Sequence, residues 1–328
     1  MRVLITGSNG FIGRATTTAF LHAGIAVCAG VRKKTCAPGG ARPEPADEGC
    51  LDTVEYGDIG PTTEWTSALE GIDCVVHLAA RVHVMHDTAT DPLAEFRRTN
   101  VAGTLSLARQ AVSCGVKRFV FVSSIKVNGE ATLPGHPFTP DDRPGPTDPY
   151  GISKLEAELG LRELEGRSGL DVVIVRPVLV YGPGVKANFR TMMRVLGAGI
   201  PLPFGGLENR RSLIGLRNLA DFLVTCARHE AAAHQTFLVS DGEDLTTSEL
   251  LRRLAALLGR PARLVNVPAS LLERIARLLR QGDIAQRICG TLQIDSSKTG
   301  TQLAWAPPFR VNDELQKTVD AFVAHSRR

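Results

Sequence analysis

Short apolar runs alternate with longer helical patterns through the first half of the chain. The runs have no polar face and therefore predict strands buried on both sides. They are Arg2–Thr6, Ile25–Val31, Cys74–Ala79, Arg118–Ser123 and Asp171–Arg176. Between them, helical spacing extends over Phe11–Ala23, Leu93–Cys114 and Tyr150–Arg167. This alternation predicts an α/β fold, a doubly wound parallel sheet with helices on both faces.

After Pro177 the pattern changes. Tyr181–Arg210 is rich in glycine and proline around one helical stretch, Asn188–Gly199. A helical pattern at Leu216–Arg228 and an apolar run at Thr236–Ser240 then predict a return to the sheet. The remaining chain predicts mostly helices, with a short strand near Arg263–Val267.

These patterns predict two parts that share the chain. We expect residues 1–180 and 211–240 to form the domain that contains the sheet. Residues 181–210 and 241–328 should form a smaller, mostly helical lobe. Such a lobe would lie over the carboxyl ends of the strands, where sheets of this kind bind ligands.

Composition and charge exclude several classes of protein. A hydrophobic fraction of 43% and a charged fraction of 22% are ordinary for a globular chain. The net charge of +4, without a run of like charges, argues against a nucleic-acid partner. No apolar stretch reaches the ~20 residues of a membrane span, and the N-terminus enters a strand at once. Seven scattered cysteines favour free thiols in a reducing compartment, with no metal site. We expect a cytoplasmic protein.

A glycine-rich turn follows the first predicted strand. Gly7, Gly10 and Gly13 form a Gly-x-x-Gly-x-x-Gly pattern that ends a strand and opens a helix. Glycine permits the tight turn and close approach, and the free N–H groups of the helix favour a pyrophosphate. The pattern predicts a Rossmann-type dinucleotide site. Its binding residues would be Gly7, Asn9, Gly10, Phe11, Ile12 and Gly13.

The end of the second strand bears on which dinucleotide binds. NAD sites usually place an acid there, but this chain has Val31 followed by Arg32 and Lys33. Two cations are expected where the ribose carries a 2′-phosphate, so the sequence favours NADP(H) over NAD(H). Asp58 and Ile59 follow the third strand, where Asp58 could bind the adenine amino group or simply cap a helix.

Three polar residues suggest redox chemistry at the sheet edge. Tyr150 and Lys154 stand four residues apart, on one face of a helix. A nearby cation lowers the pKa of a tyrosine and makes it a usable acid and base. Ser124 follows a strand and could hydrogen-bond the reacting oxygen. A Tyr-x-x-x-Lys motif alone is weak evidence for a catalytic site. Here it follows a glycine turn and a strand that ends in Ser-Ser, and this order makes coincidence improbable.

Together these motifs resemble the extended short-chain dehydrogenase/reductase family, in particular its NAD(P)-dependent nucleotide-sugar epimerase/dehydratase group. The likeness extends over nearly the whole chain. Further matching segments are His77-Leu-Ala-Ala80, Thr99-Asn-Val-Ala-Gly-Thr104 and Arg176-Pro-Val-Leu-Val-Tyr-Gly-Pro183.

The resemblance implies roles for individual residues. Tyr150 would be the acid and base, Lys154 would bind the nicotinamide ribose, and Ser124 would position the substrate oxygen. Further cofactor contacts would come from Leu78, Ala79, Ala80, Asn100 and Pro177. A UDP-sugar would lie under the small lobe, bound by Arg81, Ser124, Asn188 and Arg211. A homodimer would form through the helices at 93–114 and 150–167.

Two departures from the family pattern stand near Ser124. Asn128 replaces the tyrosine of the usual Val-Tyr-Gly, which puts the packing role of that side chain in question. Ile125 and Lys126 follow Ser124 in place of the acids of sugar dehydratases. Dehydration is therefore disfavoured, because elimination of water needs an additional acid and base.

The sequence leaves three functions open. The first is an oxidoreductase that reduces the C4 keto group of a UDP-(6-deoxy)-N-acetylhexosamine for surface polysaccharide synthesis, favoured by Arg32 and Lys33. The alternative is a UDP-hexose 4-epimerase that retains NAD. A remote third is a dinucleotide-sensing regulator, disfavoured because both Tyr150 and Lys154 are present.

Overall fold

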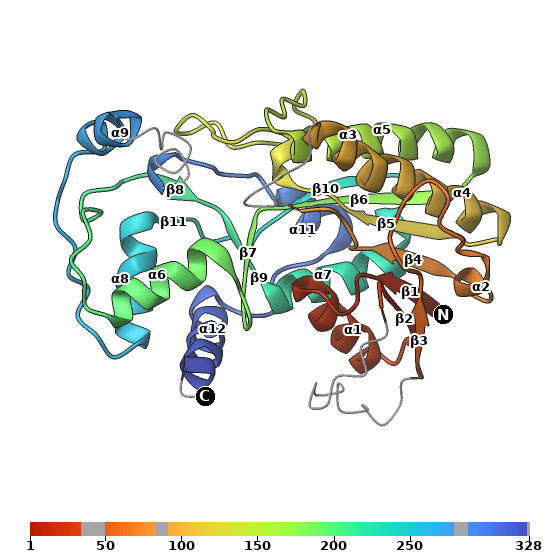
Figure 1. The fold of residues 1–328 in the computed structure, drawn as a ribbon, viewed down its shortest axis with the longest axis horizontal. Coiled ribbons are helices and arrows are strands. Elements are labelled where there is room, and N and C mark those ends of the chain that lie inside the picture. The colour runs from red at the N-terminus through yellow and green to blue at the C-terminus, as the bar shows by residue number, and fades with distance from the viewer. Residues whose placement is uncertain (34–49, 83–90, 279–287, 327–328) are drawn as a thin grey trace.

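The computed structural model of the chain describes residues 1–33, 50–82, 91–278 and 288–326. A parallel sheet of seven strands runs through its centre in the order β10-β6-β5-β4-β1-β2-β3 (Figure 1). The strands are β1 (Arg2–Thr6), β2 (Ala26–Val31), β3 (Leu51–Glu55), β4 (Cys74–His77), β5 (Arg118–Val122), β6 (Asp171–Pro177) and β10 (Thr236–Val239). The strand order reverses between β1 and β4, and sheets of this kind bind ligands at the carboxyl ends of the strands at such a reversal.

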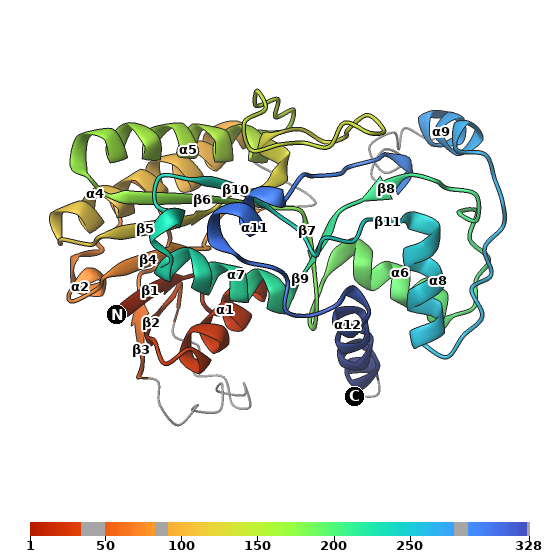
Figure 2. The same ribbon diagram turned by 180° about the vertical axis from the view of Figure 1, so that it is seen from behind.

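Helices cover both faces of the sheet, as predicted. On one face lie α1 (Phe11–His22) and α7 (Leu216–Arg228), and on the other α4 (Thr104–Ser113) and α5 (Pro149–Ser168) (Figures 1 and 2). Alternate side chains of each strand point to opposite faces, so the sheet separates two apolar cores. The doubly wound fold predicted from the alternating pattern is confirmed.

The single helix predicted over Leu93–Cys114 is interrupted. It consists of α3 (Pro92–Phe96), a π-helical segment η1 (Arg97–Gly103) and α4. Inserting a π turn rotates the following residues relative to an α-helix, and such turns often mark functional sites. Here the π turn carries the buried Asn100.

The small lobe has its own apolar core, separate from the two cores that flank the sheet. Tyr181, Phe189 and Leu251 pack there with Val311 and Leu315. Its elements are α6 (Ala187–Gly197), α8 (Thr247–Leu257), α9 (Ala269–Leu278), α12 (Val311–Ser326), β8 (Arg210–Arg211) and β11 (Leu245–Thr246). Strand β7 (Leu179–Tyr181) pairs in parallel with β9 (Leu213–Gly215). The chain leaves the central sheet along β7 and returns toward it along β9.

The strand predicted near Arg263–Val267 was wrong. Only one isolated bridge forms there, between Leu202 and Leu264. Leu264 packs against the lobe core, whereas Val265 is 52% exposed, so the segment does not have the two buried faces of a sheet strand. In the described part of the chain, no helix is both long and apolar enough to cross a bilayer.

Candidate active site

The glycine turn between β1 and α1 forms a compact cradle. Gly7 has a φ of +68°, in the left-handed region that favours glycine. A Cβ on Gly13 would lie 2.1 Å from the Gly7 carbonyl oxygen, so a side chain cannot fit there. Gly10 caps α1 without any side-chain hydrogen bond, and the first turn of α1 has no acid. The cradle thus leaves amide donors for an anion and fits a dinucleotide pyrophosphate.

The opposite side of the cradle comes from the chain after β4. The Thr6 hydroxyl lies 2.8 Å from His77 Nδ1 and accepts hydrogen bonds from the amides of Leu78 and Ala79. His77 Nε2 lies 3.0 Å from the Thr104 hydroxyl. Burial lowers the pKa of His77 to about 3, so its ring is neutral. A neutral buried histidine therefore fixes the segment that includes the predicted contacts Leu78, Ala79 and Ala80.

Asn100 connects this segment to the catalytic helix. Its side-chain oxygen accepts from the Arg81 amide at 2.8 Å, and its amide nitrogen donates to the Arg81 carbonyl at 3.0 Å. The same nitrogen donates to the Ser153 hydroxyl at 3.0 Å. Asn100 is 1% exposed, and its hydrogen bond to Ser153 is buried. Asn100 therefore connects the chain after β4 with α5.

An ion pair occupies the predicted adenosine end. Arg32, after β2, pairs with Asp58, after β3, and both side chains are about 70% exposed, at 72% and 69%. Ile59 beside them is buried, and Lys33 is exposed. Arg32 therefore already has an anionic partner. This weakens the prediction of NADP(H) binding, which treated Arg32 as a cation available to a 2′-phosphate.

The three predicted catalytic residues meet at the carboxyl end of β5. Ser124 follows β5 and caps a short turn, η2 (Ile125–Val127), by accepting from the Lys126 amide at 3.3 Å. Tyr150 lies in the first turn of α5, which Asp148 caps. One turn later, Lys154 donates to the Val122 carbonyl oxygen at 2.8 Å. Strand end and helix start therefore bring Ser124, Tyr150 and Lys154 to one edge of the sheet.

The pKa shifts differ from the sequence expectation. Burial raises the pKa of Tyr150, and the charge of Asp148 raises it further, whereas a lowered value was expected. The Lys154 ammonium, which lies 5.9 Å from the Tyr150 ring centroid and is bound to Val122, does not offset this burial. Burial also lowers the pKa of Lys154 to about 7, opposed by Glu158. A further cation near the phenol would be needed to make Tyr150 a base at neutral pH.

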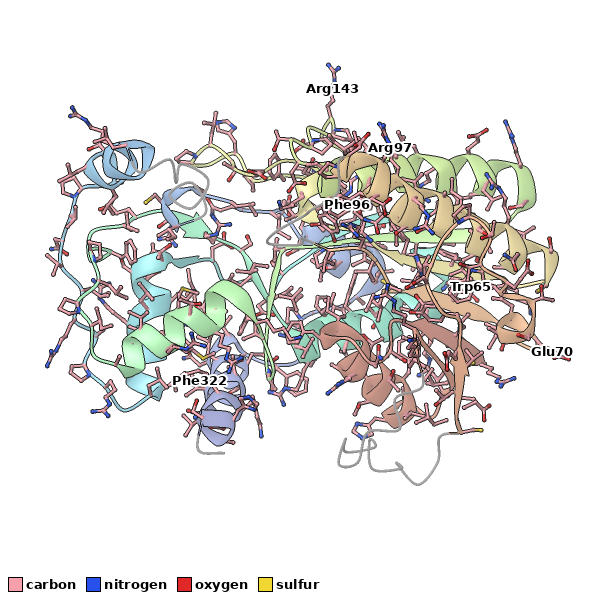
Figure 3. The ribbon with its side chains drawn as sticks, in the orientation of Figure 1. Trp65, Glu70, Phe96, Arg97, Arg143 and Phe322 are labelled. Carbon is pink, nitrogen blue, oxygen red and sulfur yellow. The ribbon has the colours of Figure 1, made fainter. Side chains whose placement is uncertain are left out.

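An aromatic wall stands beside Tyr150. The Phe96 ring lies edge-on to Tyr150, with 6.1 Å between centroids. The Arg81 guanidinium lies over Phe96, 5.5 Å from its centroid. Figure 3 places Phe96 toward the small lobe and Glu70 at the far end of the sheet. Arg81 is thus separated from Tyr150 by the Phe96 ring.

The substrate residues predicted in the lobe are not brought against the catalytic residues by any described contact. Arg211 lies on β8 and donates to the Gly290 carbonyl at 2.9 Å. The neighbouring Asn209 is 8% exposed and donates to Thr247. The backbone of Asn188 belongs to α6, but its side chain lies outside the described residues. Pro177 ends β6 and is buried.

Sequence reasoning missed a buried network under the catalytic turn. Arg176 pairs with Glu158 of α5, and both side chains are almost fully buried. The Asn128 side-chain oxygen accepts from Arg176 at 3.0 Å, and its nitrogen donates to the Thr139 carbonyl at 2.9 Å. Asn128 therefore has a defined role where the family has tyrosine. The available signal was its departure from the family pattern, four residues after Ser124.

No cluster of three or more metal-ligating side chains occurs among the residues that the structure describes. His83 and His86, which follow the fourth strand in the sequence, lie outside the described residues. The charged groups at the site are thus the lysines, arginines and carboxylates already named. Proton transfer and binding of anions are the chemistry that these groups support.

Comparison with known proteins agrees with this geometry. The model of the NAD dependent epimerase/dehydratase family matches residues 3–240. The UDP-glucose 4-epimerase of Vibrio cholerae is 44% identical over 328 residues, covering 99% of this chain and 97% of the relative. The solved structure of MoeE5 with UDP-glucose and NAD superposes with a TM-score of 0.77 at 25% identity, over 100% of both chains. The Bordetella bronchiseptica enzyme WbmG with NAD has a TM-score of 0.73 at 23% identity, over 99% and 94% of the chains.

Proposed function

Because this chain belongs to the NAD dependent epimerase/dehydratase family, we propose that it is a UDP-hexose 4-epimerase that retains NAD through its catalytic cycle. One observation carries the proposal. Ser124, Tyr150 and Lys154 lie together at the sheet edge of a chain that is 44% identical, from end to end, to a UDP-glucose 4-epimerase. Sequence reasoning had placed this function second, after a C4 reductase.

The cofactor would be held by groups that the structure describes. The amides at the start of α1 would bind the pyrophosphate, since Gly10 provides no competing side chain. Lys154 and Tyr150 would contact the nicotinamide ribose, and the chain from Leu78 to Ala80 would line the crevice. The bound nicotinamide ring supplies hydride acceptance from C4 of the sugar and its return.

The side chains of this protein supply the proton chemistry. Tyr150 removes the proton of the C4 hydroxyl and gives it back when the sugar is reduced from its other face. Ser124 donates a hydrogen bond to the same C4 oxygen and holds it near Tyr150. Lys154 lies one helical turn from Tyr150, and together with the positive charge of bound NAD⁺, the further cation that Tyr150 needs, it would favour the phenolate electrostatically. Dehydration is disfavoured because Ile125 and Lys126 take the places where dehydratases have acids.

The small lobe, residues 181–210 and 241–328, would bind the nucleotide. Arg211 would release the Gly290 carbonyl and clamp the diphosphate, because a guanidinium binds two phosphate oxygens at once. Asn188 would contact a phosphate from the first turn of α6. Arg81 would approach the sugar beside the Phe96 ring.

A C4 reductase that uses NADPH is the second candidate. It is favoured by Val31 at the end of β2, where an acid is usual in NAD sites, and by Arg32 and Lys33. The ion pair of Arg32 with Asp58 and the identity to an epimerase favour retained NAD instead. Arg32 could still exchange partners, because an exposed ion pair contributes little.

Three further parts of the proposal concern the cellular setting. The product would serve the synthesis of surface polysaccharide, in the cytoplasm, where nucleotide sugars are made. Two copies would pair through α4 and α5, which lie on the outer side of the sheet (Figure 1). Leu159 on α5 supports this pairing, because its side chain is 61% exposed.

The test uses purified protein with UDP-glucose or UDP-N-acetylglucosamine and no added nucleotide. Proton NMR of the anomeric signals should show formation of the galacto isomer from at least one of them, at a rate that NADPH does not change. Absence of any isomer from both sugars, with consumption of NADPH on a UDP-4-keto sugar, would show the reductase instead.

A further inference from the structure

Lys126 stands two residues after Ser124, and its ammonium lies between two carboxylates. It forms an ion pair with Asp148 and lies 3.4 Å from a carboxylate oxygen of Glu130. The side chains of Lys126 and Asp148 are 28% and 19% exposed, so water screens this pair less than a surface pair. The pair joins two segments that are 22 residues apart in the sequence.

Asp148 also holds the end of the helix that carries Tyr150. Its Oδ1 accepts from the Gly151 amide at 2.6 Å and thereby caps α5. The η2 turn approaches this helix end closely, because a Cβ on Gly151 would lie 3.0 Å from the Lys126 carbonyl oxygen. One carboxylate therefore binds both the start of α5 and the lysine of the Ser124 turn.

The same carboxylate acts on Tyr150 through its charge. Burial is the larger cause of the raised pKa of Tyr150, and Asp148 adds to it. The charged groups that face this region are Lys154 on α5, Asp148, Lys126, Glu130 and, beyond Phe96, Arg81. Among them, Lys126 is the cation in direct contact with Asp148.

We propose that Lys126 is a positioning residue for Tyr150: through Asp148 it fixes the Ser124 turn to the start of α5 and offsets the carboxylate charge beside the phenol. This inference rests on the proposed function in giving Tyr150 its acid–base role. The hydroxyls of Ser124 and Tyr150 must both bind the C4 oxygen of the sugar, and this requires a fixed spacing between them. Lys126, which stands where dehydratases have an acid, would thus position Tyr150 in this chain.

Two single variants should shift the titration of Tyr150 in opposite directions. Lys126→Met keeps the length of the side chain but leaves Asp148 unpaired, so the pKa of Tyr150 should rise by about one unit. Asp148→Asn keeps the helix cap but removes the negative charge, so the pKa should fall. The double variant should return to within about half a unit of the parent, and Lys126→Arg should behave like the parent.

The readout is the ¹³C NMR signal of Cζ in labelled tyrosine, recorded on the NAD-saturated protein over a pH series. The chain has three tyrosines, and the signal of Tyr150 is the one lost in Tyr150→Phe. This titration needs no sugar substrate. A failed epimerase assay would therefore refute the proposed function but leave the test of Lys126 intact. Lys117→Met, at the far end of β5, is the matched control and should leave the midpoint unchanged.

Kinetics give a second readout where the parent is active. At neutral pH, Lys126→Met should lower kcat about tenfold, with the KM for the sugar within about threefold, because a one-unit shift reduces the phenolate about tenfold. Opposite shifts in Lys126→Met and Asp148→Asn support the inference. Unchanged midpoints, or shifts in the same direction, overturn it. If Lys126→Met does not fold, Asp148→Asn alone decides: a lower midpoint supports the inference, and an unchanged or higher one overturns it.

Discussion

The Lys154 ammonium donates a 2.8 Å hydrogen bond to the main-chain carbonyl of Val122, the last residue of β5. This contact joins the helix of Tyr150 to the strand that leads into Ser124. Lys154 is 2% exposed, and burial lowers its pKa from 10.5 to about 7. Retaining a cation at this position therefore costs folding free energy.

We predict that Lys154→Met is more stable than the parent at pH 6. Between pH 7 and 10.5 the unfolded chain keeps a proton that folded Lys154 has lost, so the free energy of unfolding rises with pH in this window. Below pH 7 the parent bears the full cost of the buried charge. The difference in free energy of unfolding between Lys154→Met and the parent, measured by urea denaturation, should therefore shrink from pH 6 to pH 9. The variant should also lose turnover and cofactor binding. A less stable Lys154→Met at pH 6 would contradict this account.

A second prediction concerns the Asn128 network. Asn128→Ala removes the acceptor of Arg176 and the donor to Thr139, and leaves buried polar groups without partners. The free energy of unfolding should fall by about 2–4 kcal/mol, measured by urea denaturation. The exposed Asn312, which accepts from Arg253, is the control, and Asn312→Ala should cost less than about 1 kcal/mol. Equal losses in the two variants would refute a special role for Asn128.

A third prediction addresses the choice of cofactor. Asp58→Asn frees Arg32 from its ion pair, so NADPH binding should improve relative to NADH, by roughly tenfold. Arg32→Ala should weaken NADPH more than NADH, because only NADPH presents a phosphate to the guanidinium. Fluorescence titration of both cofactors measures the ratio. An unchanged ratio in both variants would mean that Arg32 does not reach the ribose.

The local parts of this site were predictable and the long-range parts were not. Gly7, Tyr150 and Lys154 belong to short motifs whose spacing is set by one turn or one helix, so their positions follow from the sequence. A third strand was expected before Asp58, but the residues of β3 are mostly exposed and form no apolar run that would give its bounds. The Asn128–Arg176 contact spans 48 residues, and no local spacing indicates such a pairing. The raised pKa of Tyr150 likewise depends on burial, which the motif does not encode.

Tyr150→Phe tests the assignment of the acid–base residue. Phenylalanine keeps the ring against Phe96 but removes the exchangeable proton. Turnover should fall by about two to four orders of magnitude, while NAD content stays close to that of the parent. Tyr181→Phe is the matched control, since that hydroxyl binds Asp241 in the lobe, and its folded protein should keep turnover within about threefold. A Tyr150→Phe enzyme within a few-fold of the parent would exclude this helix as the catalytic element.

The central claim is that the hydride taken from C4 of the sugar would return to the same carbon within one active site. UDP-glucose deuterated at C4 tests this claim most directly, when it is incubated with the protein and an excess of unlabelled NADH in solution. The account predicts UDP-galactose that keeps its deuterium at C4, measured by mass spectrometry and NMR. Loss of the deuterium to the NADH pool, or no UDP-galactose at all, would contradict it.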